Sequence, residues 1–121
     1  MKHIFIGVLC GFAVLSCASK TDDIHTSEAT QNATFSCDQG GTISALYSAD
    51  GSEAILDIKL VAQHIDVKNI HLNQAISGSG ARYINKKNNV VEYEWHTKAD
   101  FALLSITLSP DRTISVSCHL N

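Results

Sequence analysis

The chain has 121 residues, a formal net charge of −3, 45% hydrophobic residues and 17% charged residues. This length suits one domain, and the mild acidity excludes a basic nucleic-acid binder and a highly charged disordered chain. The 4 cysteines in so short a sequence indicate an oxidising compartment.

The first sixteen residues are typical of an export signal. Lys2 precedes an apolar run from Ile4 to Leu15, and its length of about twelve residues is well short of a membrane-spanning helix. The run ends in Val14-Leu15-Ser16-Cys17, which resembles the lipobox of bacterial lipoproteins. This resemblance implies cleavage before Cys17 and acylation of its sulfur, with diacylglycerol and palmitate. A residue other than Asp directly after the lipidated cysteine, here Ala18, resembles the sorting signal for the outer membrane, where the protein would face the periplasm. The alternative is an ordinary signal peptide that is cut after Ala18.

The segment 17–32 is predicted to be a lipidated cysteine followed by a flexible tether. Small polar and acidic residues dominate it and Ile24 is its one strongly apolar side chain, so burial cannot offset the entropy of ordering. We therefore expect a lipoprotein signal peptide at 1–16, this tether at 17–32 and a folded domain at 33–121. Loss of residues 1–16 removes one lysine and leaves 8 basic against 12 acidic residues, a net charge of −4.

Alternation of apolar and polar residues predicts β-strands across the folded domain. From Glu53 to Leu60 the even positions are apolar and the odd ones, apart from Ile55, are polar, as in a strand with one buried face. The alternation recurs in Ile43/Ala45/Tyr47, Val91/Tyr93/Trp95, Ala102/Leu104/Ile106/Leu108 and Ile114/Val116/Cys118. Turn-forming residues separate these strands at 38–41, 50–51, 78–80, 85–89 and 109–112. Since no convincing amphipathic helix intervenes, we expect an all-β barrel or sandwich.

Cys37 and Cys118 are the cysteines that remain once Cys10 leaves with the signal and Cys17 is acylated. In an exported protein such a pair is expected to form a disulfide, and two free thiols are the alternative. The bridge would tie the start of the domain to its last strand, which is a natural seam for a barrel. Closing a loop of roughly eighty residues is worth about 4 to 5 kcal/mol in the chain-entropy model.

Residues with catalytic or metal-binding chemistry form no recognised motif. Five histidines follow the signal without a short ligand pair such as H-x-H, so we expect solvated side chains, no metal and no cofactor: His25, His64, His71, His96 and His119. Alternation places His64 and His119 on outward faces. Because a nucleophile elbow and a phosphate-binding loop are also missing from the sequence, we expect no enzymatic activity. An exported metal-binding module is an alternative, and it would require zinc to raise the melting temperature.

Two stretches place small, cationic and aromatic residues on loops between predicted strands. Loops on a rigid scaffold are where binding residues concentrate. The first runs from Ile76 to Tyr83 and the second from Tyr93 to Asp100. They resemble the signature of bacterial inhibitors of C-type lysozyme, the membrane-bound group and its periplasmic relatives. The motif S-G-x-x-Y of that family matches as Ser79-Gly80-Ala81-Arg82-Tyr83. The motif Y-x-x-x-T-K-G is met by Tyr93, Thr97 and Lys98, with Ala99 in place of Gly, and the cysteine pair is also typical of the family.

The resemblance covers residues 35–119 and implies an eight-stranded antiparallel β-barrel that pushes these loops into the active-site cleft of lysozyme and so protects the cell wall. Ser79 corresponds to the hydroxyl that hydrogen-bonds in the catalytic centre, and Lys98 to the cation that pairs with a catalytic carboxylate. Tyr83 is expected to brace its loop by ring packing, and Thr97 to fix the strand end through its hydroxyl. Arg82 is a further candidate contact. Gly80 and Tyr93 complete the set as motif residues.

Three questions stay open at this point. If the family glycine has a positive φ, Ala99 costs about 1 kcal/mol or tilts the loop that carries Lys98. His96 occupies a free position of the second motif, where its protonation would tune affinity. A structural or adhesive lipoprotein with the same barrel and no inhibitor activity is the alternative function, and the sequence leaves the oligomeric state undecided.

Overall fold

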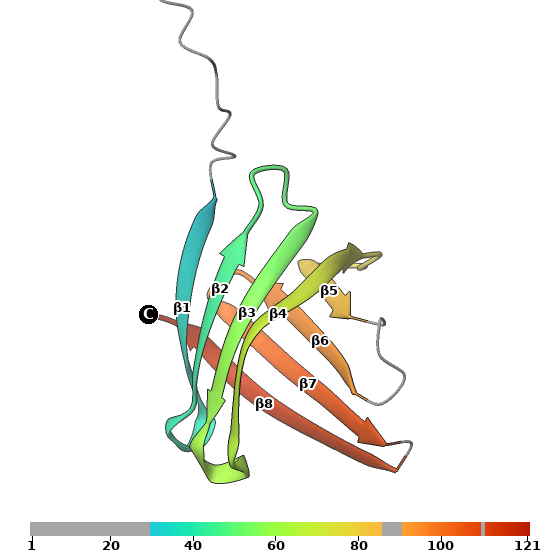
Figure 1. Ribbon diagram of the computed structural model, residues 1–121. Helices are drawn as coiled ribbons and strands as arrows, with labels where there is room; N and C mark the ends of the chain where they lie inside the picture. The colour runs from blue at the N-terminus through green and yellow to red at the C-terminus, as the bar shows by residue number, and fades with distance from the viewer. Residues whose placement is uncertain (1–29, 86–90, 110) are drawn as a thin grey trace, which may run out of the picture.

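The computed structural model describes residues 30–85, 91–109 and 111–121, which form a closed antiparallel barrel (Figure 1). Its strands are β1 Gln31–Cys37, β2 Thr42–Tyr47, β3 Glu53–Leu60, β4 Ile65–Ala75, β5 Ala81–Asn85, β6 Glu92–Lys98, β7 Phe101–Ser109 and β8 Arg112–Leu120. Two short 3-10 turns, η1 Asp38–Gly40 and η2 Val61–Gln63, follow β1 and β3. The eight-stranded all-β prediction is therefore confirmed.

Some of the predictions concern residues outside the ranges that the structure describes. The signal peptide, the lipidation site at Cys17, most of the tether and the greater part of the turn at 85–89 lie outside these ranges. Strand β1 begins at Gln31, two residues before the predicted domain start at Ala33.

The buried face of each predicted strand follows from its alternation. In β3 the even positions Ala54, Leu56, Ile58 and Leu60 are at most 1% exposed. On β7 the residues Ala102, Leu104 and Ile106 point inward in the same way. Because side chains on a strand point to alternate faces, a closed sheet collects all inward side chains into one core. The predicted pattern is confirmed in these strands.

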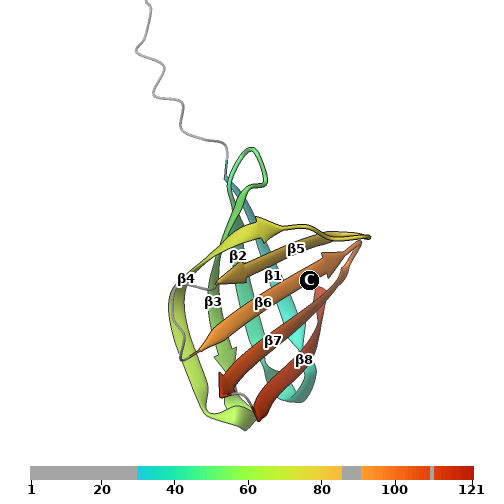
Figure 2. The same cartoon turned by 90° about the vertical axis from the view of Figure 1, so that its right-hand side faces the viewer.

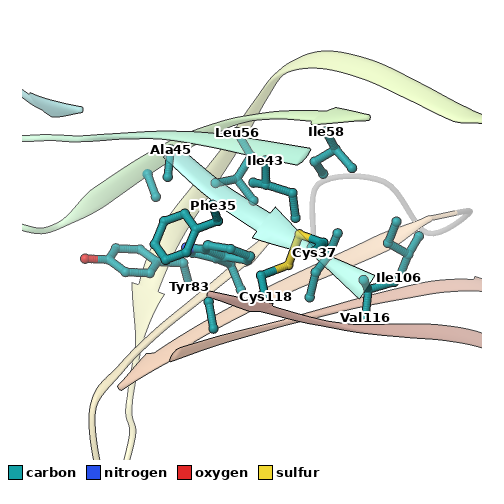
Figure 3. Close-up of a cluster of buried hydrophobic side chains, with 14 of the residues drawn as sticks. Phe35, Cys37, Ile43, Ala45, Leu56, Ile58, Tyr83, Ile106, Val116 and Cys118 are labelled. Atoms are coloured by element: carbon teal, nitrogen blue, oxygen red, sulfur yellow. A yellow bond between two sulfur atoms is a disulfide. The ribbon is translucent and has the colours of Figure 1, made fainter. Parts of the chain in front are cut away.

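A disulfide between Cys37 and Cys118 lies where the barrel closes (Figure 3). These residues are directly opposite each other in the β1–β8 pair, and Cys118 is fully buried. The bond therefore joins the first strand to the last, across a sequence separation of 81. Both the predicted pairing and its position at the seam are confirmed.

Strand β4 was not predicted by alternation because a β-bulge changes its phase. The register of β4 against β3 shifts between Leu56 and Ile58, and Asn69 has a φ of 60°. The amide of Asn69 donates to Oδ1 of Asp57 at 2.8 Å, which satisfies the backbone at the bulge. Inward residues are therefore odd-numbered before the bulge and even-numbered after it: Ile65, Val67, Ile70 and Leu72.

An aromatic cluster fills the core beneath β5 and β6. Trp95 is fully buried, packs edge-on against Phe35 at a centroid distance of 5.0 Å, and donates its indole N–H to the Tyr47 hydroxyl at 2.8 Å. A buried indole needs such a partner, so the contact stabilises the packing as well as the position of β6. Trp95 thereby joins β6 to β1 and β2 through the core.

Candidate functional site

The two motif loops come together at one corner of the barrel (Figure 2). Strand β5 pairs with β6 so that Ala81 is opposite Thr97, which brings the β4–β5 loop at residues 76–80 beside the β6–β7 turn. In the folded chain, residues 79 and 98 thus become neighbours across this pair of strands. The tertiary structure unites the two motifs that the sequence separates.

Gly80 allows this close approach. It has a φ of 69°, and a Cβ atom placed there would overlap the carbonyl oxygen of Thr97 and lie 3.2 Å from Cβ of Lys98. An L-residue at this position would have to push the two loops apart as well as adopt an unfavourable backbone conformation. The glycine of the first motif is therefore required by the contact between the loops.

His96 anchors the β4–β5 loop from the neighbouring strand. Its Nε2 lies 2.8 Å from the carbonyl oxygen of Ser79 and 3.3 Å from the hydroxyl of Ser77. Because a carbonyl oxygen can only accept, the geometry requires that Nε2 carries the proton. The hydroxyl of Ser77 also donates to the Ser79 carbonyl at 2.7 Å. Sequence reasoning missed this anchoring role, because only the β5–β6 pairing brings His96 beside the loop.

Ser79 and Lys98 are both exposed, and their polar groups are free to meet a partner. Within the described part of the chain, no hydrogen bond engages the Ser79 hydroxyl, and the one ion pair there is Arg82–Glu94. The two side chains line one shallow hollow of about 340 Å³ together with His96, Phe101 and Leu103. A hydroxyl and an ammonium at the edge of one hollow form a site suited to carboxyl groups.

Arg82 is engaged within the protein. Its Nε is 2.9 Å from Oε1 of Glu94, and its Nη1 donates to the carbonyl of Ile76 at 3.5 Å. The hydrogen bond and charge of Glu94 raise the pKa of Arg82 above its ordinary value. Both partners are about one-third exposed, so water screens the pair and its contribution to stability is small. Its predicted contact with a partner stays a prediction, whereas its position helps to hold the loop.

The other motif residues face the barrel interior. Tyr83 is 4% exposed, donates its hydroxyl to the Gly51 carbonyl at 2.9 Å, and packs against Tyr47 at a centroid distance of 5.6 Å. Burial raises the pKa of Tyr83. Tyr93 packs against the core, and the carbonyl oxygen of Thr97 lies against Gly80. Tyr83 and Tyr93 thus pack beneath the site, and a contact of these three residues with a partner stays a prediction.

Ala99 has the positive φ that was suspected from the motif. Lys98 and Phe101 are paired, so Ala99 and Asp100 form a two-residue hairpin turn, and φ of Ala99 is 51°. Such turns favour glycine at a first position with positive φ, because a Cβ is strained there. The turn that carries Lys98 is thus built on a strained alanine.

The other histidines that the structure describes lie on the outer surface of the barrel. His64, His71 and His119 are exposed, and His25 lies outside the described residues. Across 30–85, 91–109 and 111–121, no three His, Cys, Asp or Glu side chains are grouped so that they could hold a metal ion. The same ranges contain no helix with the length and hydrophobicity needed to cross a membrane.

Comparison with known protein families matches residues 35–111 to the family described as membrane-bound lysozyme-inhibitor of c-type lysozyme. The match spans 77 of the 121 residues and includes both motif loops. Comparisons with curated proteins and with solved structures gave no match.

Proposed function

The chain belongs to the family of membrane-bound inhibitors of c-type lysozyme, and we propose that it inhibits lysozyme by inserting the loops that carry Ser79 and Lys98 into the active-site cleft. The observation that carries this proposal is the shared hollow at which these two exposed side chains meet. Neither group is used by a described part of the barrel, so both are available to a partner.

The chemistry of the partner fits these two groups. Lysozyme cleaves its substrate with two carboxyl groups, one kept protonated as the acid and the other ionised. The ammonium of Lys98 would pair with the ionised carboxylate, and the hydroxyl of Ser79 would hydrogen-bond within the same centre. An ion pair in a closed cleft is stronger than one on an open surface, since water no longer screens it. Occupation of both carboxyl groups would block hydrolysis without any chemistry by the inhibitor itself.

Net charge favours the encounter. The family's partners, c-type lysozymes, are strongly basic, whereas this chain has a net charge of −4 after loss of residues 1–16. Opposite net charges accelerate association and make its rate depend on salt. The overall acidity of the chain would speed the approach of lysozyme, whereas the positive charge of Lys98 would act on the carboxylate that it contacts.

The place of action follows from the sequence before the barrel. We propose that Cys17 is acylated and anchors the chain to the outer membrane on its periplasmic side, where it protects the cell wall from lysozyme. Several acyl chains on one cysteine hold a protein far better than a single chain, because each buried methylene contributes about 0.8 kcal/mol. Mass spectrometry of the membrane-extracted protein should find the acyl chains on Cys17.

A turbidity assay with lysozyme on a cell-wall suspension tests the mechanism. The full chain, exported and purified in detergent, should inhibit stoichiometrically, and Lys98→Ala should weaken inhibition at least tenfold, or about 1.4 kcal/mol. Ser79→Ala should weaken it less, because a neutral hydrogen bond is lost rather than a charge. Lys68→Ala is the matched control, since Lys68 is an exposed lysine of β4 that does not line the hollow.

Two results would count against the proposal in different ways. Full potency in a folded Ser79→Ala/Lys98→Ala variant would refute loop insertion while leaving inhibition intact. No inhibition by the wild-type chain would leave a structural or adhesive lipoprotein as the better account.

A further inference from the structure

Exposed apolar side chains gather around the two motif loops. Among the described residues, the exposed large apolar side chains are Val61, Ile76, Phe101, Leu103 and Leu120. Ile76 lies in the β4–β5 loop and is 95% exposed, and Phe101 and Leu103 share a hollow with Ser79 and Lys98, whereas Leu120 lines a different hollow with Phe35 and Tyr83. Val61, in η2 at the other end of β4, lies away from the corner. Adjoining exposed apolar side chains mark interaction surfaces, and Phe101 and Leu103 are such a pair because they line one hollow.

The outer face of β7 changes character along its length. Phe101 and Leu103 are 46% and 39% exposed and point outward at the end of the strand next to Lys98. The outward positions farther along are the polar residues Ser105, Thr107 and Ser109. A single exposed apolar side chain is ordinary, but two large ones side by side on an outward strand face form the kind of patch that marks a contact with a partner.

Cross-strand pairing places polar groups around this apolar centre. Phe101 is opposite Lys98 on β6 and His119 on β8, and its ring meets the His119 ring edge-on at a centroid distance of 4.8 Å. Leu103 is opposite His96, which anchors the Ser79 loop. An apolar centre with a polar rim is the usual arrangement of a protein–protein contact.

We infer that Phe101 and Leu103 form an apolar contact surface for the same lysozyme molecule whose cleft receives Ser79 and Lys98. The inference rests on the proposed function. The shared hollow supports the inference, because a group that contacts Phe101 and Leu103 there also lies against Ser79 and Lys98. The occupant is an apolar side chain on the rim of the lysozyme cleft.

This surface has a physical role beyond its own contact area. A side chain seated in the hollow excludes water from the rim of the Lys98 site, and exclusion of water strengthens an ion pair beside it. A membrane or a second copy of the chain on the same surface would instead cover Lys98 and prevent inhibition. Continuity with Lys98 therefore favours lysozyme as the occupant.

Titration calorimetry of lysozyme with the full chain in detergent tests the inference. Phe101→Thr/Leu103→Thr should weaken binding at least tenfold, with a less negative heat-capacity change of binding. Threonine keeps the β-propensity of the strand, and unchanged melting of the variant checks its fold. The single variant Leu103→Thr provides a second test if the double variant melts early, with an expected loss of at least threefold. Val61→Thr is the matched control, because it removes an exposed apolar side chain at the other end and should bind like wild type.

The salt dependence separates this surface from the charged site. Lys98→Ala should reduce the dependence of affinity on ionic strength, whereas the variant at Phe101 and Leu103 keeps Lys98 and should depend on ionic strength at least as steeply as wild type. If wild type does not bind lysozyme, the proposed function fails and the inference fails with it. If wild type binds and Lys98→Ala weakens binding, but both β7 variants bind like wild type, the inference alone is overturned. Loss of self-association or of phosphatidylglycerol-vesicle binding with unchanged lysozyme affinity would also overturn it.

Discussion

Replacement of Ala99 by glycine should stabilise the barrel. The φ of Ala99 is 51°, and an L-residue in the left-handed region costs about 1 to 2 kcal/mol. Glycine relieves that strain but loses about 0.5 to 1 kcal/mol more backbone entropy on folding. The difference leaves Ala99→Gly more stable by about 0.5 to 1 kcal/mol. For a domain of this size, that corresponds to a rise in Tm of roughly 2 to 8 °C.

Ala49→Gly is a matched control for this change. Ala49 is also an exposed turn residue, but it is not among the residues with positive φ. Its replacement should lower Tm, since the entropy cost of glycine is no longer offset by relief of strain. Thermal unfolding followed by circular dichroism gives both values. Shifts of the same sign in the two variants would refute the assignment of strain to Ala99.

The variant Ala99→Gly also tests how the turn affects the inhibition of lysozyme. If Ala99 stores strain without redirecting its neighbour, Ala99→Gly should leave the inhibition of lysozyme within about twofold of wild type, which is less than 0.5 kcal/mol. A large change in inhibition at unchanged Tm would instead mean that the alanine sets the direction of Lys98. The turn would then determine affinity rather than stability.

Three further predictions concern other parts of the molecule. His96→Ala should weaken lysozyme binding several-fold, because it releases the Ser79 carbonyl. His96→Gln should restore part of the lost affinity, because the glutamine amide can donate from a similar position. Equal losses of affinity for the two variants in calorimetry would contradict the anchoring role. Hydrogen bonds from the Ser52 hydroxyl and amide and the Ser48 hydroxyl lower the pKa of Asp50 to about 2. Since this pKa is depressed on folding, the stabilisation is present above the unfolded value near 4 and is lost as pH falls toward 2. The Tm difference between wild type and Asp50→Asn should therefore be present at pH 6 and close by pH 2, and a pH-independent difference would speak against it. Cys37→Ala/Cys118→Ala should lower the free energy of unfolding by about 4 kcal/mol in urea titrations, and reductant should destabilise only the wild type, because it alone contains the bond.

Alternation predicted β2, β3, β6, β7 and β8 from the sequence, whereas β1, β4 and β5 were not identified in this way. β3 and β7 keep one apolar face along their length, which period-two reasoning detects directly. β4 changes phase at Asn69, so its apolar residues match no single face in the sequence. The strand count of eight came from the family resemblance, whereas alternation alone identified five strands.

The candidate site was likewise predictable from the sequence only in part. The motifs pointed to Ser79 and Lys98 as the groups that meet a partner, and the structure brings both to one hollow. Alternation placed Tyr93 on the inner face of its strand, and ring packing was expected of Tyr83, but the hydrogen bond from Tyr83 to Gly51 and its contact with Tyr47 depend on the tertiary structure. Phe101 and Leu103 belong to no motif, and their position at the site follows from the β6–β7 pairing.

The fold class, the inward residues of regular strands, the cysteine pair and the two motifs are evident in the amino-acid sequence, because each depends on residue type and short-range periodicity. The shared corner of the motifs, the need for glycine at position 80 and the hold of His96 on the Ser79 loop become evident in the folded barrel. These features depend on which residues of different strands lie opposite one another. That register is set by closure of the whole barrel, including the bulge at Asn69, and no local stretch of sequence contains it.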